Sequence, residues 1–404
     1  MRIKYFPAIC LSLMLMLCLA VPALADDRPA DDVLAEIDSP IPDAIEVSAS
    51  MRTLPVQSAI LISQNTGQVL FEQNPDVQLP PASITKVMTM LLVIEAVESG
   101  RITLDDVVVC SPHAASRGGS QIWLEPGEEM TVHELFKAVA ISSANDAAVL
   151  LAEHVAGSEE VFAAQMNQRA AQLGMTNTSF VNACGLDAEG HFTTARDVAL
   201  MSRELMKHPI ISEYSTIWMD SLRGGETELV NTNRLVRFYN GTTGLKTGTT
   251  AGAGSCLSAT AMRDGLGLVA VVMGSPTSDE RFAAARGLLD YGFSNYVLAE
   301  IAPVHEQLSA IRVLRGMSDS VQITADPPPS LMVKRGQEDK IEQRITLVSD
   351  VQAPVSAGQT LGRVEILVEG EPAGEYTVRA AADIARIHLG GAFLRMLGGA
   401  VNIK

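Results

Sequence analysis

Apolar residues follow several distinct periods along the 404-residue chain. Alternation at 58–62 and 69–71, around a polar turn at 65–67, predicts a β-hairpin. From Val87 onward apolar residues recur at spacings of three and four, which predicts a helix that starts near Ser83 and that Gly100 ends. The same spacing predicts further helices over 131–140, 147–156, 157–174, 195–206 and 280–289.

Strand patterns return after these helices. The stretches 255–262 and 266–273 are apolar and β-like, and the sequence Arg-Asp-Gly at 263–265 joins them as a hairpin turn would. Strands thus stand at both ends of this region, with helices between them. This order favours an α+β domain on an antiparallel sheet, over residues 51–298.

From Ile301 the pattern changes to short alternating runs separated by Gly, Pro and Asp. Regular short strands without helices indicate a small all-β domain, over residues 299–380. Strands are predicted at 311–314, 321–324, 331–334, 344–348, 363–368 and 376–378.

The last stretch, 383–404, is predicted to be an amphipathic helix with a wide apolar surface and a narrow polar stripe that includes His388 and Arg395. Charged residues inside it argue against a membrane span, so a helix lying on a membrane surface fits better. Its two Gly-Gly pairs weaken a helix, and a frayed or core-docked tail remains the alternative.

The first 25 residues have the pattern of a secretory signal peptide. Arg2 and Lys4 precede an apolar run at 9–19, and Ala-Leu-Ala at 23–25 forms the cleavage site. The chain is therefore expected to be exported. The acidic, Pro-interrupted segment 26–50 is predicted to be a disordered lead-in.

Composition excludes some classes of function. A formal net charge of −17 makes the chain a poor candidate for nucleic-acid binding. Three cysteines remain beyond the leader, Cys110, Cys184 and Cys256, which allow at most one internal disulfide. Their apolar or small neighbours predict buried thiols.

One pair of residues at the start of the 83–100 helix has the chemistry of a nucleophile and its base. Ser83 and Lys86 stand three positions apart and therefore on one helix face, and no other Ser in the chain has Lys at that spacing. A lysine with a lowered pKa can take the proton of a serine hydroxyl. By itself the pair could also be a capping Ser with an exposed Lys.

Two later stretches are candidates for the same site. Ser143 and Asn145 lie in a small polar knot between two apolar helices, where the alternative is a plain turn with Asn145 or Asp146 capping the next helix. Lys246-Thr247-Gly248 lies in a glycine-flanked strand whose backbone a ligand could approach closely. The alternative there is a Thr/Gly strand with an exposed lysine.

Ser-x-x-Lys, Ser-x-Asn and Lys-Thr-Gly, in that order, resemble the signature set of penicillin-recognising serine acyl-transferases. With the stretches 80–86 and 194–197, the β-rich tail domain and the basic C-terminal stretch, the chain resembles the low-molecular-mass penicillin-binding proteins of the serine-type D-alanyl-D-alanine carboxypeptidase family. The resemblance implies a β-lactamase/transpeptidase-like domain, an antiparallel sheet with helices on both faces. It also implies an enzyme of the outer face of the cytoplasmic membrane.

The resemblance assigns catalytic roles to four of these residues. Ser83 would attack the carbonyl between the two terminal D-alanines of a peptidoglycan pentapeptide stem. Lys86 would be its base, kept partly neutral by the positive charge of Lys246. Ser143 would pass the proton to the leaving amine, and Asn145 would orient Lys86 and the substrate amide.

It also assigns binding roles on the Lys-Thr-Gly strand. The backbone N–H groups of Ser83 and Thr249 would form the oxyanion hole. Lys246 and Thr247, beside Gly248, would hold the terminal carboxylate, with Arg281 a further candidate. No metal or cofactor is implied, and β-lactam antibiotics are the expected inhibitors.

Other outcomes use the same motifs. A β-lactamase that deacylates rapidly needs a Glu with an Asn four residues later, and no such pair occurs between Ser143 and Lys246. A D,D-transpeptidase or endopeptidase on the same scaffold remains open. A catalytically inactive wall-binding protein is the non-enzyme alternative, and the completeness of the motifs counts against it.

Overall fold

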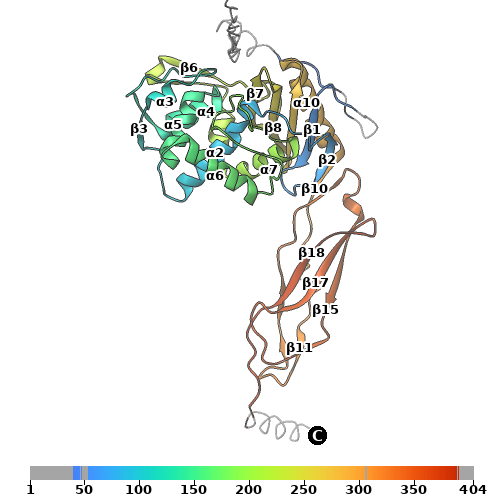
Figure 1. Ribbon diagram of the computed structural model, residues 1–404. Coiled ribbons are helices and arrows are strands. Elements are labelled where there is room, and N and C mark those ends of the chain that lie inside the picture. Colours follow the sequence, from blue (N-terminus) through green and yellow to red (C-terminus); the bar gives the residue numbers. More distant parts are fainter. Residues whose placement is uncertain (1–39, 46, 48–52, 305–306, 389, 391–404) are drawn as a thin grey trace, which may run out of the picture.

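A five-stranded antiparallel sheet organises the N-terminal domain, in the order β2-β1-β9-β8-β7 (Figure 1). The hairpin of β1 (Ser58–Ser63) and β2 (Val69–Gln73) forms one edge. The other strands are β7 (Thr242–Thr250), β8 (Gly254–Arg263) and β9 (Leu266–Ser275). Because β1 pairs antiparallel with β9, the two ends of the domain close one sheet.

The structure is a computed structural model that describes residues 40–45, 47, 53–304, 307–388 and 390. The predicted signal peptide, and residues 26–39 of the predicted lead-in, lie outside the described residues. Part of the lead-in is described and is packed against the domain rather than disordered. Ile41 is buried, and the Ile45 N–H donates to the carbonyl of Ala283.

Helices cover both faces of the sheet, as predicted. Along β1, Ile60 and Ile62 pack into the larger core with α2, whereas Ala59 and Leu61 pack into a second core under α10 (Ser278–Asn295). The alternation of a strand thus divides its side chains between two apolar layers. The larger core is completed by α2 (Lys86–Glu98), α4 (Val132–Ile141), α5 (Asn145–Ala156), α6 (Glu159–Gln172) and α7 (Ala195–Leu205).

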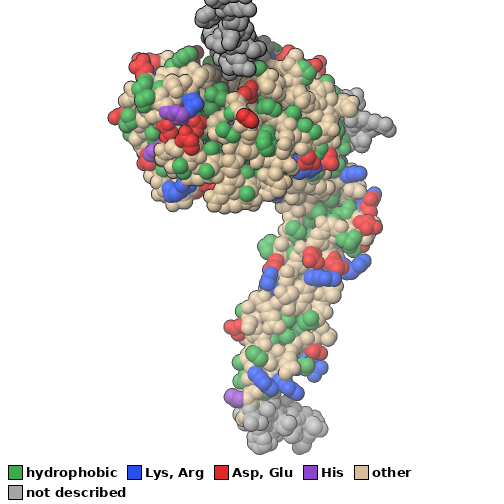
Figure 2. Space-filling view, viewed as in Figure 1, with side chains coloured by type: hydrophobic (Ala, Val, Ile, Leu, Met, Phe, Trp, Pro, Cys, Tyr) green, Lys and Arg blue, Asp and Glu red, His purple; other side chains and the backbone are tan. Residues whose placement is uncertain are grey.

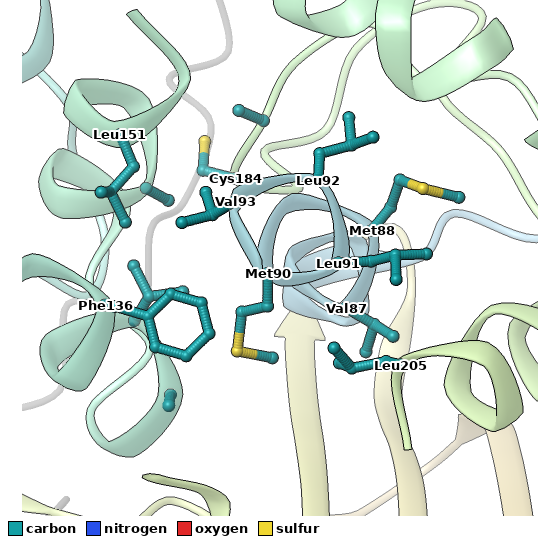
Figure 3. Close-up of a cluster of buried hydrophobic side chains, with 14 of the residues drawn as sticks. Val87, Met88, Met90, Leu91, Leu92, Val93, Phe136, Leu151, Cys184 and Leu205 are labelled. Carbon is teal, nitrogen blue, oxygen red and sulfur yellow. The ribbon is translucent and has the colours of Figure 1, made fainter. Parts of the chain in front are cut away.

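Helix α2 lies in the centre of the larger core. Most of its side chains are apolar and buried, and Figure 3 shows Met88, Met90 and Val93 pointing toward different neighbours. A helix that is apolar on every side is a buried one. Helical structure begins near Ser83, as predicted: the 3-10 turn η1 (Ala82–Thr85) runs directly into α2, which begins at Lys86.

The structure contradicts the alternative interpretation of the polar stretch between α4 and α5, in which Asn145 or Asp146 caps α5. Thr131 and Glu134 form the predicted capping box of α4. Helix α5 begins at Asn145, and Ala144 occupies its N-cap position without a side-chain hydrogen bond. Asn145 therefore belongs to the first turn and its side chain is available for other contacts.

Smaller elements complete the N-terminal domain. They are β3 (Val107–Val109), α3 (Pro112–Ala115), β4 (Glu129–Thr131), η2 (Pro209–Ile211), α8 (Ser212–Ser215), β5 (Met219–Leu222), η3 (Arg223–Gly225), β6 (Thr227–Val230) and α9 (Leu235–Phe238). Cys110, Cys184 and Cys256 are all buried and free, as predicted.

The C-terminal domain is all-β and extends from the larger domain as a narrow body (Figures 1 and 2). Its four-stranded sheet has the order β13-β18-β17-β15 and its three-stranded sheet β12-β11-β16. Between the domains, β10 (Tyr296–Ala299) pairs with β14 (Leu331–Lys334). The remaining elements are β11 (Ile311–Leu314), β12 (Ser320–Val321), β13 (Ile323–Ala325), η5 (Glu338–Lys340), β15 (Ile341–Leu347), β16 (Asp350–Gln352), β17 (Thr360–Val368) and β18 (Glu371–Ala380).

The predicted C-terminal helix does not begin at Asp383. Ile384 forms a β-bridge with Val355, and Arg386 forms one with Gly316, so this segment runs along the domain. The remainder of the predicted helix, 389 and 391–404, lies outside the described residues. In the part of the chain that the structure describes, no helix is long and apolar enough to cross a membrane.

Candidate active site

Three segments far apart in sequence meet at the side-chain nitrogen of Lys86. Its Nζ donates to Ser83 Oγ at 2.9 Å, to Asn145 Oδ1 at 2.6 Å and to the carbonyl of Cys184 at 2.7 Å. Lys86 is 0 % exposed because it begins the central helix α2. The structure therefore joins the Ser-x-x-Lys and Ser-x-Asn motifs through one buried amine.

Two glycines allow other backbone segments to approach Ser83. A Cβ on Gly185 would lie 1.9 Å from the carbonyl oxygen of Ala82, and a Cβ on Gly248 would lie 2.8 Å from the Ser83 nitrogen. Gly185 has φ +90°, which L side chains rarely adopt. Both sides of the Ser83 turn are thus held by close backbone contacts.

Ser143 and Asn145 are presented by the break between α4 and α5. Ser143 has φ +66° and is 3 % exposed, and its Oγ has no hydrogen-bond partner among the residues that the structure describes. A buried hydroxyl without a partner is rare, and a strained backbone often marks a functional position. Asn145 Nδ2 donates to the carbonyl of Gly118 at 2.6 Å, which turns its Oδ1 toward Lys86.

Strand β7 supplies the third motif. Lys246 is 1 % exposed and its Nζ donates to the Thr247 carbonyl at 3.1 Å. Thr247 Oγ1 donates to Thr232 Oγ1 at 2.6 Å. Arg281, from α10, donates from Nη1 to Thr249 Oγ1 at 2.9 Å. The structure thus brings the weakest of the sequence candidates, Arg281, to the Lys-Thr-Gly strand.

Burial dominates the electrostatics of the two lysines. It lowers the pKa of Lys86 from 10.5 to about 8, although the interactions with Cys184 and Asp146 act in the opposite direction. Burial likewise lowers the pKa of Lys246, helped by the positive charges of Lys86 and Arg281. Removal from water is thus the largest cause of the lowered pKa of Lys86, and the expected contribution of Lys246 stays a prediction.

Several groups that support the site belong to none of the three motifs. The carbonyls of Gly118 and Cys184 act through the backbone, so their side chains give no signal. The buried carboxylate of Asp146 accepts the N–H groups of Ile122 and Leu124 and so fixes the loop before α4. Only its position beside Asn145 could have singled it out.

This arrangement suits covalent catalysis by Ser83. A hydroxyl hydrogen-bonded to an amine of lowered pKa can be deprotonated and attack a carbonyl. Among the residues that the structure describes, no group of three or more His, Cys, Asp or Glu side chains could hold a metal ion.

Comparison with known proteins gives the family. Residues 45–277 match the family model described as D-alanyl-D-alanine carboxypeptidase. The chain belongs to this family. Residues 299–386 match the C-terminal domain of penicillin-binding protein 5. The family inferred from the three motifs is thereby confirmed, and with it a serine-type carboxypeptidase.

Three relatives of this carboxypeptidase span 60 % to 84 % of its chain. D-alanyl-D-alanine carboxypeptidase DacF of Bacillus subtilis is 42 % identical over 82 % of this chain and 86 % of its own length. The structure of penicillin-binding protein 5 from Haemophilus influenzae is 28 % identical, with a TM-score of 0.75 over 84 % of this chain and all of that one. Penicillin-binding protein D2 from Listeria monocytogenes, in its ampicillin-bound form, is 33 % identical, with a TM-score of 0.55 over 60 % of this chain and 99 % of that one.

Replacing Gly185 should damage the site of the carboxypeptidase more than its fold. In Gly185→Ala the new Cβ must displace the Ala82 carbonyl and with it Ser83, so we expect the rate of labelling by fluorescent penicillin to fall ~100-fold.

Gly174→Ala is the matched control. Gly174 also has a positive φ, +77°, but nothing lies within 4 Å of its Cβ position. Its cost should be backbone strain alone, about 1–2 kcal/mol of stability. Equal labelling rates in the two variants would contradict the close-approach argument.

Proposed function

We propose that this carboxypeptidase removes the terminal D-alanine from peptidoglycan stem peptides through an acyl-enzyme on Ser83. The observation that carries the proposal is the 2.9 Å hydrogen bond between Lys86 Nζ and Ser83 Oγ, made by an amine that is shielded from water. A buried amine loses its proton more readily than an exposed one. Lys86 is thereby suited to be the base for this hydroxyl.

The acylation step follows from the placement of these groups. Lys86 takes the proton of Ser83 Oγ, which attacks the carbonyl carbon between the two terminal D-alanines. The Oγ–C bond forms, the C–N bond breaks, and D-alanine leaves after its nitrogen receives a proton. Ser143 relays this proton from Lys86, a role that suits its buried hydroxyl without an internal partner. Asn145 holds Lys86 through Oδ1.

Backbone N–H groups of Ser83 and Thr249 stabilise the oxyanion in this proposal. One such donor contributes about 3 kcal/mol of transition-state stabilisation. The absence of a side chain on Gly248 keeps β7 close to the Ser83 nitrogen, which supports a site between these two segments.

The substrate carboxylate is bound on strand β7. Lys246, Thr247 and Arg281 supply a positive charge, a hydroxyl and a guanidinium that can hold it. Water then attacks the ester carbonyl with Lys86 as base, and the Ser83 hydroxyl is restored. A β-lactam antibiotic presents a carboxylate beside a strained amide, so it acylates the same serine.

Replacement of Ser83 tests the central role. Ser83→Ala should release no D-alanine from diacetyl-Lys-D-Ala-D-Ala and form no penicillin adduct, because the nucleophile is gone. Ser142→Ala is the control, since the Ser142 hydroxyl bonds only to its own helix at Ala138. Free D-alanine and fluorescent labelling are measured together. Release of D-alanine by Ser83→Ala would contradict the assignment of Ser83 as the nucleophile. Transfer of the acyl group to an added amine by the wild-type protein, in place of hydrolysis, would indicate a transpeptidase.

The pH dependence of acylation tests Lys86 as the base. Only the neutral amine can accept a proton, and burial lowers the pKa of Lys86 to about 8. The second-order rate of penicillin labelling should therefore rise about tenfold from pH 6 to pH 7 and level off above about pH 8. A rate that is flat between pH 6 and pH 9 would contradict this role.

We also propose that residues beyond the C-terminal domain attach the exported enzyme to the outer face of the cytoplasmic membrane. The support is the sequence, in which the apolar residues Phe393, Leu394 and Leu397 stand close to the basic residues His388 and Arg395. Such a basic amphipathic segment favours an anionic lipid surface.

Vesicle sedimentation tests this attachment. The chain without residues 1–25 should sediment with phosphatidylglycerol vesicles, and Phe393→Asp with Leu397→Asp should abolish this because the apolar surface is lost. Penicillin labelling of the double variant should stay unchanged, which shows that its catalytic domain is intact. Undiminished sedimentation of the double variant would contradict the proposal.

A further inference from the structure

A buried carboxylate outside the three motifs, Glu159, lies behind the site. Glu159 is the first residue of α6 and is 6 % exposed. Its Oε1 accepts the Ala183 N–H at 3.0 Å, and its Oε2 accepts from Arg117 Nη2 at 2.8 Å. His113 also contacts Oε2, at 2.9 Å. An ordinary acid at a helix N-terminus faces solvent, whereas this one joins two separate segments of the chain.

One of these segments holds Lys86 directly. Ala183 precedes Cys184, whose carbonyl accepts from Lys86 Nζ at 2.7 Å. The Ala183 carbonyl also accepts from Thr89 Oγ1 at 2.6 Å, on the helix that carries Lys86. By accepting the Ala183 N–H, Glu159 therefore helps to fix the short segment whose Cys184 carbonyl is one of the acceptors of Lys86.

The other segment holds Lys86 through Asn145. Arg117 precedes Gly118, whose carbonyl accepts from Asn145 Nδ2 at 2.6 Å. Asn145 Oδ1 is in turn the second acceptor of Lys86, at 2.6 Å. The Arg117–Glu159 ion pair thus connects the two fixed acceptors of Lys86 and closes a ring of covalent and hydrogen bonds around it.

We propose that Glu159 and Arg117 are positioning residues that hold Lys86 in line with Ser83 by tying together the two loops that present its acceptors. This inference rests on the proposed role of Lys86 as the base. Its physical reason is geometric: a displacement of about 1 Å at a reacting group can cost ~100-fold in rate. The Arg117–Glu159 pair is only partly buried, with 23 % of the Arg117 side chain exposed, and such a pair adds little stability by itself.

Glu159→Gln is the first test, because it removes the charge with almost no change of volume. The amide oxygen can still accept the Ala183 N–H, but an NH₂ group then faces the guanidinium of Arg117. We expect penicillin labelling at saturating pH to fall ~10- to 100-fold. For diacetyl-Lys-D-Ala-D-Ala, kcat should fall while KM stays nearly constant, since the β7 carboxylate site is untouched.

The pH profile separates positioning from a merely structural role. Loss of the negative charge and of well-placed acceptors both destabilise the ammonium form of Lys86, so the acid limb should move to lower pH. The other titratable groups around Lys86 are Asp146 on α5, the Cys184 thiol, Lys246 on β7 and, beyond Lys246, Arg281 on α10. Glu159→Gln leaves all four in place.

Glu204→Gln is the matched control. Glu204 pairs with Arg169 at 2.8 Å, its side chain is 20 % exposed, and Arg169 also keeps Glu95. This variant should keep the wild-type labelling rate and acid limb. A second pair, Arg117→Lys and Arg117→Gln, covers the case that Glu159→Gln does not fold. Lysine can still reach the carboxylate and should retain most of the rate, whereas glutamine should not.

The outcomes decide between the alternatives. A folded Glu159→Gln with unchanged rate and acid limb overturns the inference, as does a loss of rate that only follows a lower melting temperature while the acid limb stays in place. If only the Arg117 variants fold, equal rates in both overturn it. Wild-type protein that forms no penicillin adduct would instead overturn the proposed function, which distinguishes the two failures.

Discussion

The burial of Lys86 is the constraint on which the rest of the site depends. A lysine amine removed from water must either be surrounded by acceptors or lose its proton. This structure does both: three oxygen acceptors surround Nζ, and burial lowers the pKa to about 8. The apolar helix α2 is the means, because its central position carries its first residue into the core.

The acceptors impose further order on the domain. Each comes from a different segment, so the loops before α4, the break before α5 and the stretch around Cys184 must all be fixed in place. Asp146 does this for one loop through the N–H groups of Ile122 and Leu124. Close packing at Gly185 does it for the segment beside Ser83. The hydroxyl of Ser143 is the exception, because no residue that the structure describes offers it a hydrogen-bond partner.

Local patterns predicted much of the fold. The β1–β2 hairpin, the capping box of Thr131 and the alternating strands of the second domain all follow from short-range periodicity and turn chemistry. The local pattern failed at the C-terminal end, where Ile384 forms an isolated β-bridge with Val355 instead of lying in the predicted helix. It also gave no sign that the turn at Ser83 is 3-10 and packs closely against Gly185 and Gly248.

Of the site, the sequence by itself determined the candidate side chains, because Ser83, Lys86, Ser143, Asn145 and Lys246 stand in three short motifs whose order alone is informative. Tertiary structure decided how they act. The pKa of Lys86 depends on how deeply α2 is buried, which no local spacing encodes. The acceptors at Gly118 and Cys184 are backbone carbonyls, which every residue type has. Glu159 is connected to them only through long-range contacts, with Arg117 42 residues away in the sequence and with Ala183 24 residues away. Backbone contacts and long-range pairings leave no mark in a motif, so only the fold reveals them.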